Sequence, residues 1–415
     1  MKRLRAYKYE LQPNGEQIRK MRRFAGSCRF VFNRALALQA ENRKSGEKKI
    51  GYVGLCKEIT GWRHNQETAW LANAPIHPLQ QALKDLETAY ANFFARRARF
   101  PNFRKKNRNS RFRYPDPKQI KLDQVNSRIF LPKLGWVQYR NSRVALGDVK
   151  NVTIRLEDGR WFASIQTERE VEVPIHKSTS VIGIDLGIRR FATLSDGSFL
   201  APLGSFRKHE EALAKEQRKL KSMKGPRDRK NPKKRQAPSN NWKKQQGKVA
   251  KIHYRIACAR RDYLHKATTT ICKNHAVAVV EDLRVRNMSA SASGTVEKPG
   301  RNVRQKAGLN KAILDQGWGE FRRQLEYKME WAGGQVIKVP PQYTSQECPT
   351  CRYMSKGNRK TQESFSCENC GFAANADHVG AINVERAGLA RMACGSNGAL
   401  TPSEAGTRRG DLLHA

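Results

Sequence analysis

Three acidic residues that lie far apart in the sequence each occupy a local pattern suited to a metal-dependent nuclease. Asp185 lies in the apolar sequence VIGIDLG, which predicts a strand with this acid near its middle, followed by a second strand that ends at an Asp-Gly turn. Glu281 ends the apolar run HAVAVVE, which predicts a buried parallel strand, and open α/β sheets place their sites at the carboxyl ends of such strands. Asp377 falls in the first turn of a predicted helix that Gly388 closes. We expect the three carboxylates to converge on a pair of divalent cations, which would activate a water and stabilise the leaving oxygen of a phosphodiester.

Each acid also has a simpler interpretation on its own. An Asp in the sequence GIDLG is equally typical of an actin-like ATPase, and a Glu after an apolar strand is commonly a solvated strand end. An Asp at a helix start is favoured by the helix dipole. The combination favours a nuclease, because a phosphate-binding ATPase needs neither a large positive charge nor the zinc-binding signature that lies just before Asp377.

The zinc-binding signature consists of two Cys-x-x-Cys pairs, Cys348 with Cys351 and Cys367 with Cys370, separated by fifteen residues. This spacing is typical of a site in which each pair forms a tight turn and four thiolates surround one Zn²⁺. Four sulfur ligands leave the metal no open position, so we expect a structural zinc and chemistry at the carboxylates. Disulfides are the alternative, but an odd total of nine cysteines and no secretory signal favour a reducing compartment. The five cysteines outside the pairs are scattered: Cys28, Cys56, Cys258, Cys272 and Cys394.

The charge balance indicates a polyanionic partner. The chain of 415 residues has 80 lysines and arginines against 37 acids, a net charge of +43, which predicts many phosphate contacts and salt-sensitive binding of nucleic acid. An anionic membrane surface is the alternative, but the basic residues run through the whole chain and do not gather on one amphipathic helix. No apolar run approaches the roughly 18 residues of a membrane span, so we expect no membrane partner. We expect a cytoplasmic protein that joins the nucleoid when it is bound to DNA.

The elements around these residues follow from the periodicity of apolar residues. Three- and four-residue steps predict helices over residues 18–35 and 79–93. Segment 93–114 interleaves aromatic residues with arginines and lysines, which suits base stacking beside phosphate contacts; inward packing of the rings is the alternative. We predict strands over 110–175 and expect the N-terminal strand to join them. Over 207–251 we predict basic helices joined by a loop that lies over a nucleic-acid channel. An amphipathic helix at 309–331 is stopped by a glycine pair before another strand.

Several sequence strings, in this order and spacing, resemble the TnpB family of transposon-encoded proteins, relatives of the type V CRISPR effectors. They are GIDLGIRRFATLSDG, VVEDLRVRNM, GWGEFRRQLEYKMEWAGG, YTSQECPTC, NRKTQESFSCENCGFAANAD and AINV, preceded by RAYKYELQPNGEQ, FPNFRKK and FRYPDPKQIKL. The resemblance rests on independent motifs and covers almost the whole chain to about residue 390.

The resemblance implies a multidomain fold of α/β and α+β type. An RNase H-like RuvC nuclease domain with an inserted zinc ribbon would follow a β-rich wedge domain that carries a helical recognition insert. In this layout the wedge domain comprises residues 1–13 and 105–178, the recognition domain 14–104, the nuclease domain 179–345 and 373–390, and the zinc ribbon 346–372. Residues 391–415 are small and polar, which predicts a disordered tail.

The resemblance also implies an RNA-guided DNA endonuclease. A transposon-derived guide RNA would pair with one strand of double-stranded target DNA, and the protein would read a short motif beside the target. We expect one protein chain per guide RNA. By motif, Asp185, Glu281 and Asp377 match the three RuvC acids, which would bind Mg²⁺ or Mn²⁺, and Cys348, Cys351, Cys367 and Cys370 match the zinc ligands.

Two positions depart from the family pattern. Val379 stands where the family commonly has Asn, and Gly380 follows where Ala is usual, while Asn383 is retained. Arg352 follows the first cysteine pair where the family often has Gly, and a left-handed turn there costs Arg more than Gly. Two other functions stay open. One is a nuclease-weak RNA-guided repressor, against which the three intact acids argue, and the other is a transposase acting on transposon ends, for which we find no helix-turn-helix.

Overall fold

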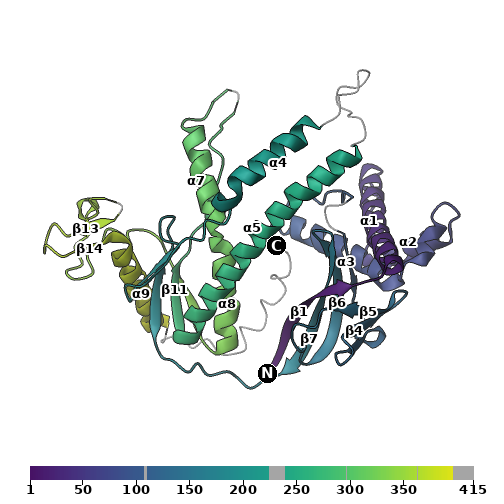
Figure 1. Cartoon of the computed structure of the whole chain (residues 1–415), viewed down its shortest axis with the longest axis horizontal. Helices are drawn as coiled ribbons and strands as arrows, with labels where there is room; N and C mark the ends of the chain where they lie inside the picture. The colour runs from purple at the N-terminus through teal and green to yellow at the C-terminus, as the bar shows by residue number, and fades with distance from the viewer. Residues whose placement is uncertain (107–109, 224–238, 296, 362, 396–415) are drawn as a thin grey trace. The chain divides into compact units, whose positions relative to one another are not determined.

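The computed structural model describes residues 1–106, 110–223, 239–295, 297–361 and 363–395, and the chain forms two compact units, Met1–Glu172 and Val173–Ala415 (Figure 1). Each unit has a hydrophobic core of its own. None of the helices in the described part of the chain combines the length and apolar character that crossing a bilayer requires.

The N-terminal unit contains a seven-stranded antiparallel sheet in the order β2-β6-β7-β1-β5-β4-β3. β1 (Lys2–Gln12) is central because it pairs along most of its length with β7 (Arg160–Glu170) and at its end with β5 (Gly135–Tyr139). The N-terminal strand therefore joins the β-rich segment, as the sequence predicted. The other strands are β2 (Arg111–Tyr114), β3 (Lys121–Asp123), β4 (Arg128–Leu131) and β6 (Asp148–Glu157).

Helices α1 (Gly15–Lys44), α2 (Tyr52–His64) and α3 (Ile76–Phe94) lie between β1 and β2 in the sequence. The predicted apolar stripes of α1 and α3 are buried, with Met21 and Leu83 fully inaccessible to solvent in one core with the strands. Short 3₁₀ turns occupy Ala69–Asn73 and Pro117–Gln119. The helical and β-rich segments thus share a single hydrophobic core.

The C-terminal unit is built on a five-stranded sheet in the order β10-β9-β8-β11-β12. The neighbours β8 (Val181–Asp185), β11 (Val277–Glu281) and β12 (Gln335–Val339) are parallel. β9 (Ala192–Leu194) and β10 (Phe199–Leu200) continue the sheet antiparallel beyond β8. Because parallel strands need long crossovers, the chain between β8 and β11 has room for the basic helices α4 (Glu210–Ser222) and α5 (Asn240–Asn274).

Helices cover both faces of this sheet. Ile182, Ile184 and Val280 pack with α5 and with α8 (Trp318–Ala332), whereas Val279 on the other face packs with Val384 of α9 (Ala376–Gly395). Figure 1 shows α9 on one side of β11 and α8 with α5 on the other. The smaller elements of this unit are Arg207–His209, α6 (Val285–Met288), Lys356–Asn358, β13 (Ser364–Ser366) and β14 (Ala373–Asn375).

Three details differ from the sequence predictions. The predicted helix 309–331 is two helices, α7 (Val303–Gln316) and α8, because Gly317 adopts a left-handed φ of 76° between them. Helix α9 runs past Gly388 to Gly395, five residues into the expected tail, and residues 396–415 lie outside the described part of the chain. Asp185 is the last residue of its strand and does not lie mid-strand. Most of the predicted loop between the two basic helices, residues 224–238, also lies outside the described residues.

Candidate active site and zinc site

The pairing of β8 with β11 brings the first two acids to the same edge of the sheet. Val280 lies opposite Ile184 in the parallel register, so Glu281 and Asp185, the next residues, end their strands side by side. Side chains alternate between the two faces of a strand. Since Ile184 and Val280 face α5 and α8, both acids are directed to the face that α9 covers.

Helix α9 approaches this face closely because the strand beneath it carries a glycine. A Cβ at Gly183 would lie 2.1 Å from the carbonyl oxygen of Ala381 and 2.7 Å from the amide nitrogen of Glu385. No side chain fits in that gap, so only glycine allows the two backbones to approach this closely. In α9, a Cβ at Gly380, the residue before Ala381, would lie 3.0 Å from Oδ2 of Asp185, which places the start of the helix against this carboxylate.

The third acid stands at the start of α9. The side chain of Asn375 caps the helix by accepting hydrogen bonds from the amides of Asp377 and His378, at 3.1 and 3.3 Å. Asp377 is therefore held in the first turn, as the sequence predicted, and its charge acts on Asp185.

Burial and neighbouring charge disfavour the charged form of Asp185, and burial does the same at Glu281. Burial, then the charges of Glu281 and Asp377, raise the pKa of Asp185 to about 7, with Arg359 acting in the opposite direction. Burial also raises the pKa of Glu281, while a hydrogen bond from Thr344 and the charge of Arg359 limit the rise. The structure thus brings together the three acids that the sequence singled out, and it concentrates negative charge where water is scarce.

Arg359 supplies a compensating positive charge. Its Nη2 lies 3.4 Å from Oδ1 of Asp377, and its charge acts on Asp185 and Glu281 as well. Carboxylate oxygens are the ligands that Mg²⁺ and Mn²⁺ prefer, and a divalent cation would stabilise the charged forms that burial disfavours at Asp185 and Glu281 and that repulsion also disfavours at Asp185. The donor set therefore fits a hard divalent cation, although the three carboxylates do not all lie within 4.8 Å of one another as the cysteine sulfurs do.

A hydrogen-bonded loop after β12 holds Glu281. Oγ1 of Thr344 donates a hydrogen bond of 2.8 Å to Oε1 of Glu281. The loop itself is fixed to α9 by Asn383, which is buried and whose Nδ2 donates to the carbonyl oxygens of Thr344 and Glu347, both at 2.8 Å. Thr344 and Arg359 were absent from the sequence prediction, because neither stands in a local pattern that marks a site. The available signal was their position within YTSQ and NRKTQ, two strings that carried the family resemblance.

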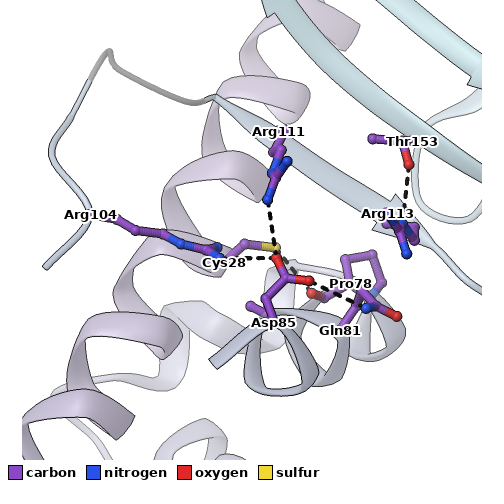
Figure 2. Close-up of a pocket in the computed structure, with 9 residues that line it drawn as sticks. Cys28, Pro78, Gln81, Asp85, Arg104, Arg111, Arg113 and Thr153 are labelled. Atoms are coloured by element: carbon purple, nitrogen blue, oxygen red, sulfur yellow. Dashed lines mark hydrogen bonds and ion pairs between the residues drawn. The ribbon is translucent and has the colours of Figure 1, made fainter. Parts of the chain in front are cut away.

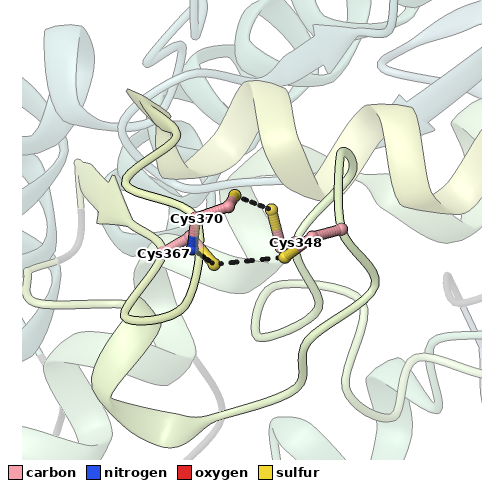
Figure 3. Close-up of side chains that lie close together, drawn as sticks. Cys348, Cys367 and Cys370 are labelled. Atoms are coloured by element: carbon pink, nitrogen blue, oxygen red, sulfur yellow. Dashed lines mark hydrogen bonds between the residues drawn. The ribbon is translucent and has the colours of Figure 1, made fainter.

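The four cysteines of the signature converge as predicted (Figure 3). Sγ of Cys348 lies 3.7 Å from Sγ of Cys370, and Sγ of Cys351 lies 3.5 Å from Sγ of Cys367. Zinc–sulfur bonds of about 2.3 Å in a tetrahedron give sulfur–sulfur edges of about 3.8 Å. A hydrogen bond from the amide of Tyr353 lowers the pKa of Cys351 to about 6, which favours the thiolate that binds metal. The donor set and its dimensions therefore fit Zn²⁺.

The two departures from the family pattern have local explanations. Arg352 adopts a φ of 66° after the first cysteine pair, and Gly371 adopts 72° at the equivalent place after the second, so the left-handed turn expected at Arg352 is confirmed. Val379 is fully buried and packs with Phe365 and the cysteines in the core of the zinc-binding insert. The side chain at position 379 therefore packs α9 against the insert, and an apolar residue suits that contact.

The basic and aromatic segment 93–114 of the N-terminal unit has two kinds of residue. Arg104 points inward, with its guanidinium carbon 3.7 Å from the ring centre of Phe32. Figure 2 shows that Nη2 of Arg104 approaches Oδ2 of Asp85, at 3.0 Å, and that Arg111 approaches the same oxygen at 3.7 Å. Phe112 and Tyr114 are also buried, so the inward packing that was the alternative holds for these residues. Phe94, Phe100 and Phe103 remain exposed, and residues 107–109 lie outside the described part.

Three family models match parts of this chain. Residues 164–292 match a family described as "Probable transposase", and residues 318–384 match "Cas12f1-like, TNB domain". The second match includes all four cysteines and one of the three acids, Asp377, at the start of α9. Residues 1–48 match a model described as "Helix-turn-helix domain", which the sequence prediction did not find; these residues form the strand β1 and the single helix α1.

Relatives match over nearly the full length. The chain is 54% identical over 395 residues to "Putative RNA-guided DNA endonuclease InsQ" of Escherichia coli (strain K12), covering 95% of each protein. It is 32% identical over 414 residues to a protein of Streptomyces pristinaespiralis with the same description but no gene name, covering 98% of this chain and 94% of the relative. Among solved structures, the Cas12f1 chain of a Cas12f1–sgRNA–target DNA complex aligns with a TM-score of 0.50 at 10% identity, covering 92% of this chain and 99% of that one. At that identity the likeness concerns the mixed α/β fold alone.

Proposed function

The chain belongs to the TnpB family of transposon-encoded proteins, and from this premise we propose that it is an RNA-guided DNA endonuclease. Its substrate is double-stranded DNA beside a short adjacent motif, and its cutting site is formed by Asp185, Glu281 and Asp377. The convergence of these three carboxylates, two of them with raised pKa values, is the observation that carries the proposal. Buried acids with raised pKa values that lie beside other acids are typical of functional sites, including sites that bind divalent cations.

The domain assignment follows from the same premise. The sheet order β10-β9-β8-β11-β12, antiparallel on one side of β8 and parallel on the other, supports an RNase H-like RuvC nuclease domain in residues 179–345 and 373–390. The insert 346–372 is the zinc ribbon. The seven-stranded sheet of the N-terminal unit supports a wedge domain in 1–13 and 105–178, with the recognition domain in 14–104.

Each side chain at the cutting site has a chemical role in the proposal. The three acids would hold two Mg²⁺ or Mn²⁺ ions, and these ions would supply an activated water and stabilise the leaving oxygen of the phosphodiester. Thr344 orients Glu281 through its hydrogen bond to Oε1, which leaves Oε2 for a ligand. Arg359 neutralises charge beside Asp377 and is placed to contact a phosphate oxygen, since guanidinium groups bind phosphate well. The zinc is structural and holds the loops from which Arg359 extends.

Recognition of the target is divided between RNA and protein. A guide RNA from the transposon pairs with the target strand, and the net charge of +43 holds the RNA–DNA duplex through its backbone. Backbone contacts carry no base information, so only a few side chains read the adjacent motif. One chain acts with one guide RNA, in the cytoplasm and on the nucleoid.

A transposase remains the second candidate, because the matching families are described as a probable transposase and a helix-turn-helix domain. A transposase would choose DNA through protein contacts with the transposon ends. Within residues 1–48, all of which are described, one strand and one helix do not supply the second helix of such a motif. This favours recognition by RNA.

The test is to reprogramme the guide. The segment of the co-purified RNA that pairs with target is changed to match a new DNA sequence beside an unchanged adjacent motif, and cleavage is measured in Mg²⁺. We expect cutting to move to the new sequence. Cutting that stays at the old sequence, or that proceeds equally without RNA, would refute RNA guidance.

A second arm tests the cutting site. Asp185→Ala and Glu281→Ala should abolish cleavage while target binding by the protein–RNA complex changes little, because affinity comes from basic residues and base pairing. Asp196→Ala is the matched control, an acid in the same unit outside the carboxylate cluster, and should cut normally. Cleavage at the wild-type rate by either cluster variant would show that the site is elsewhere.

A further inference from the structure

Within the N-terminal unit, a cavity of about 720 Å³ lies where the ends of α1 and α3 meet. Its walls combine aromatic rings from α3 and the following segment with cationic side chains from the end of α1 and the loop after it. We call it the aromatic cavity. Its lining includes Arg43, Lys44, Lys49, Tyr90, Phe94 and Phe100.

A chain reversal after α3 builds the aromatic wall. The helix ends at Phe94, and Arg96 adopts a left-handed φ of 57°, which turns the chain back. The reversal brings Phe100 edge-on against Tyr90 and Phe93, with ring centres 5.6 and 5.3 Å apart. These edge-to-face contacts hold the rings in fixed positions.

The rings of the wall are open to solvent to an unusual degree. Phe94 is 66% exposed and Phe100 is 38% exposed, although both belong to a cluster of four aromatic residues. Phe94 stacks on Tyr90 with an interplanar angle of 21°. An apolar surface that is pre-formed and left open in this way is typical of a binding site.

Cations surround the exposed rings. Nζ of Lys49 lies 4.9 Å from the ring centre of Tyr90 and 5.9 Å from that of Phe94. Arg43 and Lys44 stand in the last turn of α1, and neither forms an ion pair with any of the described residues. Glu47 is the only acid of the lining, so the cavity has two positive charges in excess.

We infer that the aromatic cavity binds an unpaired nucleotide of RNA, with the base on the Phe94 and Phe100 rings and its phosphates beside Lys49, Arg43 and Lys44. Stacking requires a base whose face is free, which a base inside a duplex does not offer. The cationic rim provides the complementary charge for the backbone. An apolar peptide would leave these cations without partners.

The acid on the rim favours RNA over DNA. The carboxylate of Glu47 can accept a hydrogen bond from a ribose 2′-hydroxyl, and deoxyribose has no such donor. The inference deepens the proposed function, because an RNA-guided protein must hold unpaired segments of its guide as well as paired ones. It assigns one such segment to the recognition domain.

Photocrosslinking of the full chain tests the inference. The probe is an unstructured oligouridylate containing 5-iodouridine, and its deoxyuridine counterpart is run in parallel. We expect crosslinks that map by peptide mass spectrometry to Phe94 or Phe100, stronger with the RNA. Crosslinks confined to other residues, or equal crosslinking of the DNA, would overturn the inference as an RNA site.

Matched variants separate stacking from charge and from folding. Phe94→Ala should weaken oligouridylate binding roughly 5- to 150-fold, the range for one stacked base, and Phe94→Tyr should restore it. Phe199→Ala is the control, since Phe199 is 53% exposed but lies in the C-terminal unit and does not line the cavity, and it should bind normally. Lys49→Ala should lower the slope of log affinity against log salt by about 0.7, whereas Phe94→Ala should leave the slope unchanged. Equal binding by Phe94→Ala and the wild type would overturn the inference.

The outcomes distinguish this inference from the proposed function. Binding of the probe requires no guided cleavage, so crosslinking at Phe94 in a protein that fails the reprogramming test would leave the cavity assigned and the proposed function refuted. Guided cleavage in a protein whose Phe94→Ala variant binds RNA normally would refute only the aromatic cavity.

Discussion

The buried charge of Asp185 predicts a trade-off between stability and function. Because the folded protein raises the pKa of Asp185 from 3.8 to about 7, its contribution to stability is fully present below pH 4 and is lost as pH rises through 7. Asp185→Asn keeps the shape and removes the charge. In buffer without added divalent ions, the variant should therefore be more stable than the wild type, by an amount that grows with pH.

The magnitude follows from the shift. At about 1.4 kcal/mol per pKa unit, a change from 3.8 to about 7 predicts that Asp185→Asn gains roughly 4 kcal/mol at pH 8, about 2 kcal/mol at pH 5 and almost nothing at pH 3. The assay is urea unfolding followed by hydrogen exchange of peptides from β8 and β11, with zinc retained. Mg²⁺ should stabilise the wild type more than the variant, and the variant should not cut DNA.

Asp196→Asn is the matched control for this prediction. Burial favours a raised pKa at Asp196, but hydrogen bonds from Ser198 outweigh it and lower the pKa, so removal of this charge should give no gain at any pH. A gain for Asp185→Asn that is the same at pH 5 and pH 8, or a loss of stability at pH 8, would refute the argument that repulsion and burial strain this carboxylate.

Three further predictions follow from the geometry. Cys348→Ser should lower the zinc content, measured by elemental analysis, from about one per chain to near zero. It should also expose the insert to proteolysis, because structural zinc contributes on the order of 10 kcal/mol to local folding. Full zinc content would contradict the four-sulfur site. Gly183→Ala should lower the stability of the C-terminal unit in urea unfolding by several kcal/mol and abolish cleavage, because the new Cβ would lie 2.1 Å from the carbonyl oxygen of Ala381 in α9. Wild-type stability of this variant would show that α9 does not pack this closely. Thr344→Val should weaken Mn²⁺ binding, measured by electron paramagnetic resonance, and slow cleavage roughly tenfold. Thr344→Ser should retain both, because the hydroxyl alone reaches Glu281. Equal effects of the two variants would contradict a role for the hydrogen bond.

The fold was predictable where periodicity and turn residues act locally. The run around Val279 is apolar on both faces because helices cover both sides of β11, and the chain reversal at Gly333 is marked in the sequence by a glycine pair. The break at Gly317 was missed because a single glycine inside an apolar pattern is tolerated by many helices. The left-handed φ that makes it a break depends on tertiary packing, here against Arg260 and Leu264.

The candidate site was predictable in its charged ligands but not in their support. Asp185 and Glu281 end apolar strands, and strand alternation then determines the face on which they lie. Asn383 and Thr344 act through hydrogen bonds to backbone and side-chain atoms more than 30 residues away, and no local pattern encodes such a pairing. Arg104 illustrates the same limit, since only the folded structure shows that Asp85 and Phe32 turn it inward.

The order of elements along the chain has a consequence for its synthesis. Both buried strands and the zinc-binding insert precede α9, so Asp377 leaves the ribosome after every other part of the carboxylate cluster. A chain that ends before Ala376 has no third acid and leaves Val279 and Val339 without the helix that covers them. If the proposed site is right, such a product would not cut, and it would expose the apolar face that α9 covers. We therefore expect a chain that terminates before α9 to lack cutting activity even though both strands and the four cysteines have been synthesised.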